Sequence, residues 1–229
     1  MTPSKNPIIA IIDIFRSPIE CFAAIYERPK WAILPYLMIL LGSFILWGSY
    51  FNHVDMPWLQ QNIQAQLGNI GENVQQSWLT REVLLAGEVF SDITGRTVVI
   101  FVLALWLKLA TKGSQHQHSY GKWLAAVCFI MLPSFIGDIA SYINIVFNHN
   151  NILPNAADLN SFNGLLKLPM NNRWAAIATT MPLLAPWYIA LTYAAVSAWT
   201  DLDRAKAIII AVLPWVLTII IWPLLIISA

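Results

Sequence analysis

The sequence predicts an all-α integral membrane protein, built as a five-helix transmembrane bundle. Two observations of composition point there, because 58% of the 229 residues are hydrophobic and only 11% are charged. Soluble domains carry about 25% charged residues, so the composition excludes a cytosolic enzyme, a disordered chain and a disulfide-stapled secreted domain. The third observation is that the apolar residues gather in five long segments.

The five segments are long enough to cross a membrane. A transmembrane helix needs roughly 20 mostly apolar residues to span a hydrocarbon layer of about 30 Å. The segments that meet this requirement are 31–51, 90–110, 121–147, 174–199 and 205–227. Segment 90–110 is the least apolar, and it spans only if Asp92 and Arg96 lie inside the helix.

The basic residues orient the predicted bundle, because cytoplasmic segments of membrane proteins are enriched in Lys and Arg. With the N-terminus in the cytoplasm, nine of the 13 basic residues fall on inner segments and four on outer segments. The nine are Lys5, Arg16, Arg28, Lys30, Lys108, Lys112, Lys122, Arg204 and Lys206. The bias predicts a cytoplasmic N-terminus and an outer C-terminus. We also expect Trp31, Trp123 and Trp199 at the inner interface, where tryptophan is enriched.

Two short interfacial helices are predicted in residues 1–30, ahead of a membrane domain at 31–229. Asn6-Pro7 is typical of a helix start, and Ser17-Pro18-Ile19-Glu20 predicts a capping box. The second helix has an apolar face made of Ile19, Phe22, Ala23 and Tyr26. Beside a membrane entry, such a face indicates an anchor in the cytoplasmic interface. A docking helix for a partner is the alternative.

Two longer segments are expected on the outer side, at 52–89 and 148–173. In the first, Leu59, Ile63 and Leu67 are four apart, and the apolar pattern resumes after Gly71 at Leu79. This spacing predicts two amphipathic helices against the outer face of the bundle. The second segment is rich in Asn and is expected to be mostly irregular.

Few ionisable residues fall inside the predicted spans. Each is a candidate functional residue, because a charge in lipid costs roughly 2.5–3.5 kcal/mol or more. Asp138 lies in the third span, and Glu88, Asp92 and Arg96 share one helical face in the second. Counting about 1.5 Å per residue from the inner ends puts Asp138, Asp92 and Arg96 near the outer third of the membrane. We hypothesise that the two aspartates share Arg96 as counter-ion, either as a buried clamp between helices or as a proton or ion relay.

Prolines interrupt the predicted spans at five positions, which are Pro133, Pro182, Pro186, Pro214 and Pro223. Each is a candidate helix kink, because proline removes a backbone hydrogen bond. Broken helices occur in transporters, although proline is also common in ordinary spans. 

Nothing in the sequence predicts catalysis. His116 and His118 lack the third and fourth ligands of a metal site, and the sequence contains no phosphate-binding loop, nucleophile elbow or metalloprotease motif. We therefore expect no catalytic residue, no metal site and no cofactor.

Three stretches of the sequence, in their order along the chain, form a pattern typical of a known family. NPIIAIIDIFRSPIECFAAIYERPKW, which ends in Arg-Pro-x-Trp, leads into the first span, and HSYGKWLAAVCFIMLP leads into the third. WYIALTYAAVSAWTDLDRAKAIIIAVLPW joins the last two spans through a short charged turn. Together these stretches resemble the Yip-domain family of five-span membrane proteins, which is related to Rab-GTPase-interacting factors, over nearly the whole chain.

The resemblance implies a non-enzymatic scaffold or adaptor in membrane organisation or traffic. Eukaryotic relatives bind Rab GTPases through a long cytosolic N-terminal region, whereas this chain is similar to a short bacterial member, which implies the bacterial inner (plasma) membrane. The expected partners are the lipid bilayer and membrane proteins or further copies of the chain. Nucleic acid is not expected, because the net charge is only +1. The alternative function is a transporter, channel or lipid-moving protein that uses the Asp/Arg cluster.

Overall fold

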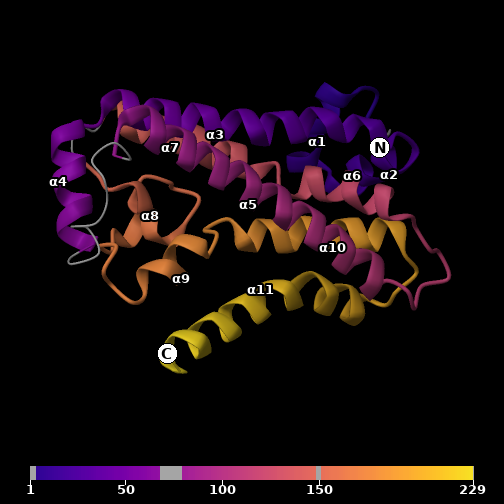
Figure 1. The fold of residues 1–229 in the computed structure, drawn as a ribbon. Helices are drawn as coiled ribbons and strands as arrows, with labels where there is room; N and C mark the ends of the chain where they lie inside the picture. Colours follow the sequence, from indigo (N-terminus) through magenta and orange to yellow (C-terminus); the bar gives the residue numbers. More distant parts are fainter. Residues whose placement is uncertain (1–3, 68–78, 148–150, 229) are drawn as a thin grey trace. The chain divides into compact units, whose positions relative to one another are not determined.

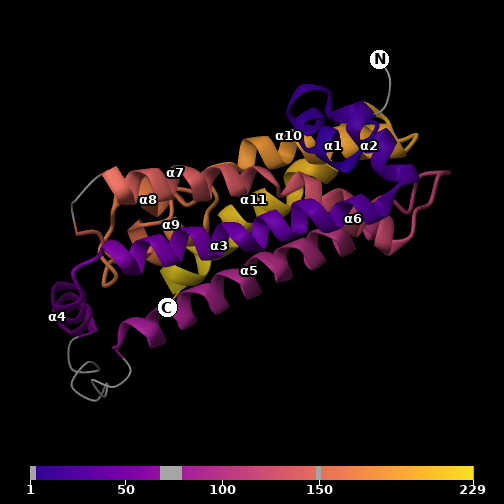
Figure 2. The same ribbon diagram turned by 90° about the horizontal axis from the view of Figure 1, so that it is seen from above.

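The computed structural model describes residues 4–67, 79–147 and 151–228, and the regular elements in these ranges are helices (Figures 1 and 2). The predicted all-α class is therefore confirmed for the described part of the chain. The residues fall into two compact units. Unit one comprises Met1–Ile39, Gly95–Pro133 and Leu184–Ile220, and unit two comprises Leu40–Thr94, Ser134–Leu183 and Ile221–Ala229.

Helices divide between the units as follows. Unit one holds α1 (Pro7–Arg16), α2 (Pro18–Glu27), the 3-10 helix η1 (Pro29–Ala32), α6 (Tyr120–Ile130) and α10 (Ala185–Trp199). Unit two holds α4 (Met56–Leu67), α7 (Pro133–Phe147, with Pro133 at the boundary), η4 (Pro154–Ala156), α8 (Phe162–Leu166) and α9 (Ala175–Thr180). Three helices continue from one unit into the other, namely α3 (Ile33–His53), α5 (Arg81–Ala110) and α11 (Arg204–Ser228).

Three helical segments among the searched residues have the length and composition to cross a membrane. They are Pro29–His53, Arg81–Ala110 and Tyr120–Phe147, with 25, 30 and 28 residues, and they coincide with the first three predicted spans. The third consists of α6 and α7, which are separated by a turn at 131–132. Pro133 explains this interruption, because proline cannot continue the hydrogen-bond ladder of a preceding helix.

The fourth predicted span, 174–199, is not one continuous helix. Helix α9 ends at Thr180, Met181 is extended, and α10 begins only at Ala185. Pro182 causes the break, because it lacks an N–H and pushes the residue before it toward extended backbone. The polar backbone groups at the break pair with segment 160–162: the N–H of Phe162 donates to the carbonyl of Met181 at 3.0 Å, and the N–H of Leu183 donates to that of Asn160 at 2.6 Å.

Segment 148–173 is more ordered than its sequence predicts. From residue 151 onward it contains η4 and α8, and α8 packs against both η4 and α9. Asn163 is completely buried, and its side-chain amide donates to the carbonyls of Asn155 and Leu168 at 2.7 and 3.3 Å. The Asn163 side chain thus stabilises this segment through hydrogen bonds to its backbone. The prediction treated asparagine only as a residue typical of loops and did not anticipate these bonds.

The N-terminal helices form as predicted, but their caps and faces differ in part. Asn6 caps α1 by accepting from the N–H of Ile9 at 2.8 Å. Ser17 makes no side-chain capping bond, so the predicted capping box is wrong. Its N–H instead donates to the carbonyl of Asp13 at 2.7 Å, because Ser17 also ends α1. The residues that α2 buries are Cys21, Phe22, Ala24 and Ile25, so only Phe22 of the predicted face is buried.

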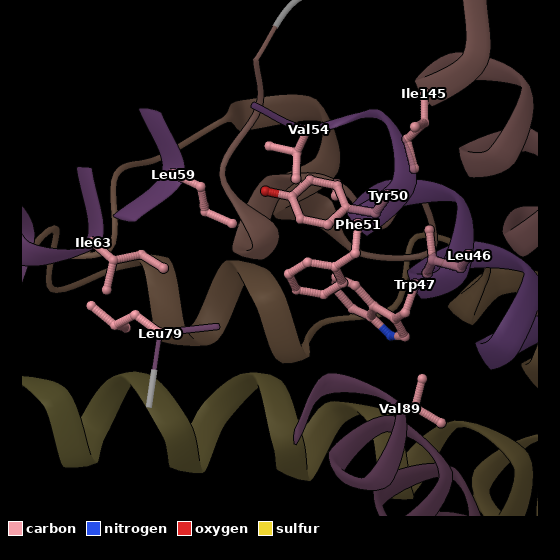
Figure 3. Packing of buried hydrophobic residues seen from close by; sticks show 11 residues of the cluster. Leu46, Trp47, Tyr50, Phe51, Val54, Leu59, Ile63, Leu79, Val89 and Ile145 are labelled. Atoms are coloured by element: carbon pink, nitrogen blue, oxygen red, sulfur yellow. The ribbon is translucent and has the colours of Figure 1, made fainter. Parts of the chain in front are cut away.

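An apolar cluster in unit two joins the end of α3 to α4 and to the start of α5 (Figure 3). It contains Leu46, Trp47, Tyr50, Phe51, Val54, Leu59, Ile63, Leu79, Val89, Ile145 and Ala157. The predicted first outer helix corresponds to α4. The second predicted outer helix falls partly on 68–78, outside the described residues, and its last part belongs to α5.

Candidate functional site

Asp138 is the centre of a buried polar site in unit two. It lies on α7 and is completely buried. Asn160, from the segment before α8, donates its side-chain N–H to Asp138 Oδ1 at 2.7 Å. Ser141 lies on the same face of α7, where its hydroxyl donates to the carbonyl of Gly137 and accepts from the N–H of Leu159, each at 2.8 Å. The carboxylate and the hydroxyl together attach the segment 159–160 to α7.

Two glycines allow side chains to pack directly against helix backbone at this site. A Cβ atom added to Gly42 on α3 would overlap with Asp138 Oδ2, and one added to Gly137 would overlap with Asn160 Oδ1. The Asp138 side chain therefore fits against the bare backbone of α3. This packing joins α3, α7 and the segment around Asn160 at one point, and we call Gly42, Gly137, Asp138, Ser141 and Asn160 the Asp138 clamp.

The other ionisable residues of the predicted cluster lie on α5. Glu88 and Asp92 belong to unit two and Arg96 to unit one, and all three are half-buried. One partner of Asp138 in the structure is Asn160. The sharing of Arg96 between Asp92 and Asp138 stays a prediction.

The five candidate prolines occupy different kinds of position. Pro133 starts α7, and Pro186 lies in the first turn of α10, where a missing N–H costs the helix nothing. Pro182 lies in the break between α9 and α10 and forms a β-bridge with Ser161. Pro214 and Pro223 lie within α11.

Sequence reasoning missed Asn160 and Gly42. Asn160 lies in a segment expected to be irregular, 22 residues after its partner, and no local pattern distinguishes it from the other asparagines there. Gly42 could have been recognised as a site of close helix packing, because small residues in a membrane span let helices approach closely. The sequence does not say which residue packs against it.

A second cluster, the aromatic junction, lies in unit one and consists of Phe22, Tyr26, His118, Trp123 and Trp199. The ring centroids of its contacting pairs are 5.0 to 6.4 Å apart, mostly in edge-to-face arrangement. It joins α2, the loop before α6, α6 and the end of α10. Helix α2 packs on both α6 and α10 (Figures 1 and 2).

Trp199 and His118 make hydrogen bonds within the aromatic junction. The indole N–H of Trp199 donates to the carbonyl of Phe22 at 2.8 Å, and His118 Nε2 donates to the carbonyl of Trp199 at 2.5 Å. Trp123 and Trp199 are buried inside the protein (0% and 5% exposed), where their large rings fill the space between α2, α6 and α10. Their place at the inner membrane interface stays a prediction.

The loop between α5 and α6 is also held to the turn between α10 and α11. The hydroxyl of Ser114 and the N–H of Gln115 donate to Asp201 Oδ1 at 2.5 and 3.0 Å. The bond from Ser114 is the main cause that lowers the pKa of Asp201 below its ordinary value of 3.8. His116 also approaches this carboxylate, at 3.9 Å, whereas His118 bonds the carbonyl of Trp199, so the two histidines have different neighbours.

Comparison with known proteins gives one match. The model of the Yip1 domain family matches residues 12–225. No curated protein and no solved structure matches the chain. The matched range includes both the Asp138 clamp and the aromatic junction.

The Asp138 clamp leads to a prediction about Gly42. Gly42→Ala is expected to lower the free energy of unfolding by about 1–3 kcal/mol, the usual cost of overpacking a tight core. Gly48→Ala on the same helix is the matched control, because an added Cβ there meets no atom within 4 Å. Thermal unfolding in detergent should separate the two variants. Equal melting temperatures would show that α3 and Asp138 are not in close contact.

The Asp201 contact predicts a pH dependence. Because the folded state lowers the pKa of Asp201, the carboxylate stabilises the loop pairing above its ordinary pKa of 3.8. The stabilisation is lost as the pH falls through the lower, folded-state pKa. Hydrogen exchange of the Gln115 amide should therefore accelerate in strong acid, relative to its intrinsic rate, and in Asp201→Asn at neutral pH. Asp203→Asn is the control, because Asp203 accepts from Lys206 and should leave Gln115 protected.

Proposed function

The chain belongs to the Yip1 domain family of membrane proteins, and we propose that it acts as a non-enzymatic, five-span scaffold or adaptor. Its apolar helices make it an integral membrane protein. The proposal has two parts, the path of the chain through the membrane and the role of the buried polar site. Each part is supported by a different observation and has its own test.

The lengths of the apolar helices support several crossings. The first three predicted spans coincide with helical segments of 25, 30 and 28 residues that are long and apolar enough to cross. Helix α11 has 25 residues, about 37 Å at 1.5 Å per residue, which is enough to cross. Helix α10 has 15 residues, about 22 Å, so the fourth crossing needs the segment around the break at Pro182 as well.

The distribution of charge supports a cytoplasmic N-terminus. Of the 13 basic residues, three lie in unit two, namely Arg81, Lys167 and Arg173, which leaves ten in unit one. Unit one also contains every segment predicted to be cytoplasmic. By the positive-inside rule, this asymmetry favours placing those segments in the cytoplasm. We further propose the bacterial inner membrane as the location, as the resemblance to bacterial members of the family implies.

The Asp138 clamp is the observation that supports a scaffold. A relay needs an acid that exchanges protons or ions with water, whereas Asp138 is completely buried, bonded to Asn160 and packed on Gly42. A buried carboxylate with protein donors fixes the positions of the elements around it. The clamp thus fixes α3, α7 and the segment around Asn160 relative to one another within unit two, and a scaffold needs such fixed elements in order to present a constant surface to partners.

The five-span topology predicts opposite accessibility for two exposed positions. In intact cells, a membrane-impermeant maleimide should label Asn171→Cys from outside, because residue 171 lies in a predicted outer segment. It should label Gln117→Cys only after permeabilisation, because residue 117 lies in a predicted inner loop. Both side chains are exposed in the structure. The reverse labelling pattern would overturn the orientation.

The scaffold role predicts protein contacts on an exposed helix face. A photo-crosslinking residue at Val102, which is 60% exposed on α5, should give discrete protein adducts in native membranes. Leu103 is the matched control, because it is 4% exposed on the same helix and should give none.

A proton-permeability measurement in proteoliposomes can contradict the scaffold role. Wild type and Asp138→Asn should show the same low proton permeability when a trapped pH dye is followed. A proton or ion flux that disappears in Asp138→Asn would refute the scaffold role and establish a relay.

A further inference from the structure

Helix α1 is apolar on two opposite faces. Ala10 and Ile14 are completely buried on the face toward α2, where the Cys21 thiol donates to the carbonyl of Ala10 at 3.2 Å. Ile8 and Ile12 lie on the opposite face, 66% and 48% exposed. One face of α1 is therefore committed to the protein, and the other is an apolar surface of isoleucine.

The face of α1 that carries Ile8 and Ile12 is unsuited to water. The charged residues of α1 are Asp13, which accepts from the hydroxyl of Ser4 at 2.6 Å, and Arg16 at its last turn. Ile19, at the start of α2, is also exposed (55%). Exposed isoleucines on one face of a helix indicate contact with lipid or with another protein.

The position of α1 in unit one favours lipid. Helix α1 packs on α2, and α2 packs on η1, which leads into the membrane-spanning α3. At the start of α3, Ile33 and Leu37 are exposed as well (62% and 55%), as expected of residues that face acyl chains. Arg28 lies over the ring of Trp31, 4.9 Å from its centroid, and both residue types are typical of the membrane interface. Helix α1 is thus held close to the membrane entry.

We propose that the Ile8–Ile12 face of α1 inserts into the interface of the leaflet where α3 begins. The helix has ten residues, about 15 Å, so it lies in the interface and does not cross. Residues 1–30 contain four basic and three acidic residues, a net charge of +1. Insertion therefore depends on contact with acyl chains more than on anionic headgroups. The inference rests on α3 as a membrane span and deepens the proposed function by naming lipid as the ligand of α1, whereas the buried face of α2 packs on α6 and α10.

Fluorescence quenching tests this insertion in the full-length protein. A single environment-sensitive nitrobenzoxadiazole label is placed at Ile12→Cys, and the protein is reconstituted into phosphatidylcholine vesicles that contain lipid with a shallow nitroxide. Glu27→Cys is the exposed control on α2. The native Cys21 and Cys128 are both buried. Burial, with a smaller contribution from Asp13, raises the pKa of Cys21 to about 12, so its thiol reacts slowly with the maleimide of the label.

The expected result is that the label at residue 12 is quenched several-fold more strongly than the label at residue 27, in neutral vesicles and in vesicles with added phosphatidylglycerol alike. Ile8→Cys provides a second position on the same face if Ile12→Cys does not fold. Emission typical of water without lipid quenching would overturn the proposal. Emission typical of an apolar site without lipid quenching would also overturn it, because a protein surface would then cover α1. Either outcome leaves the crosslinking test of the scaffold role intact.

Discussion

The hydrogen bond from Asn160 to Asp138 is the interaction on which unit two depends. A carboxylate removed from water needs partners within the chain, because its desolvation is otherwise uncompensated. Here the partner comes from a segment outside the predicted spans, and that segment is in turn fixed by Ser141 and by the backbone bonds at the Pro182 break. The hydrogen bond to this one buried carboxylate thus helps to position α7, segment 158–162 and the break at Pro182 relative to one another.

Backbone breaks and buried side chains obey the same constraint in this protein. Pro182 interrupts a helix, and in lipid the freed N–H and carbonyl groups would each cost several kcal/mol if unpaired. Segment 160–162 supplies those partners, as a short β-bridge between Ser161 and Pro182. In unit one the same requirement is met by aromatic residues, since the indole of Trp199 bonds the carbonyl of Phe22 while its ring fills the space beside Tyr26.

The sequence was sufficient for the helical class and for the first three candidate membrane helices, because these follow from composition and length. It also singled out Asp138 as a charge placed among apolar residues, and its functional role stays a prediction. It did not predict the partner of Asp138, since Asn160 is distant in the chain and only folding brings the two together. The face of α2 was predicted from apolarity alone, and apolar residues surround much of that helix. Packing on α6 and α10 then decides that Cys21, Ala24 and Ile25 are buried.

The way in which each unit is held favours a fixed architecture over a moving one. A movement that separates Asp138 from Asn160 would leave the Asn160 amide buried beside Gly137 without this acceptor. In unit one, opening the loops would separate Asp201 from Ser114 and Gln115 and disturb the packing of Trp199. Each movement breaks several contacts at once, which supports the proposal that Asp138 and Asp201 hold the elements around them in place.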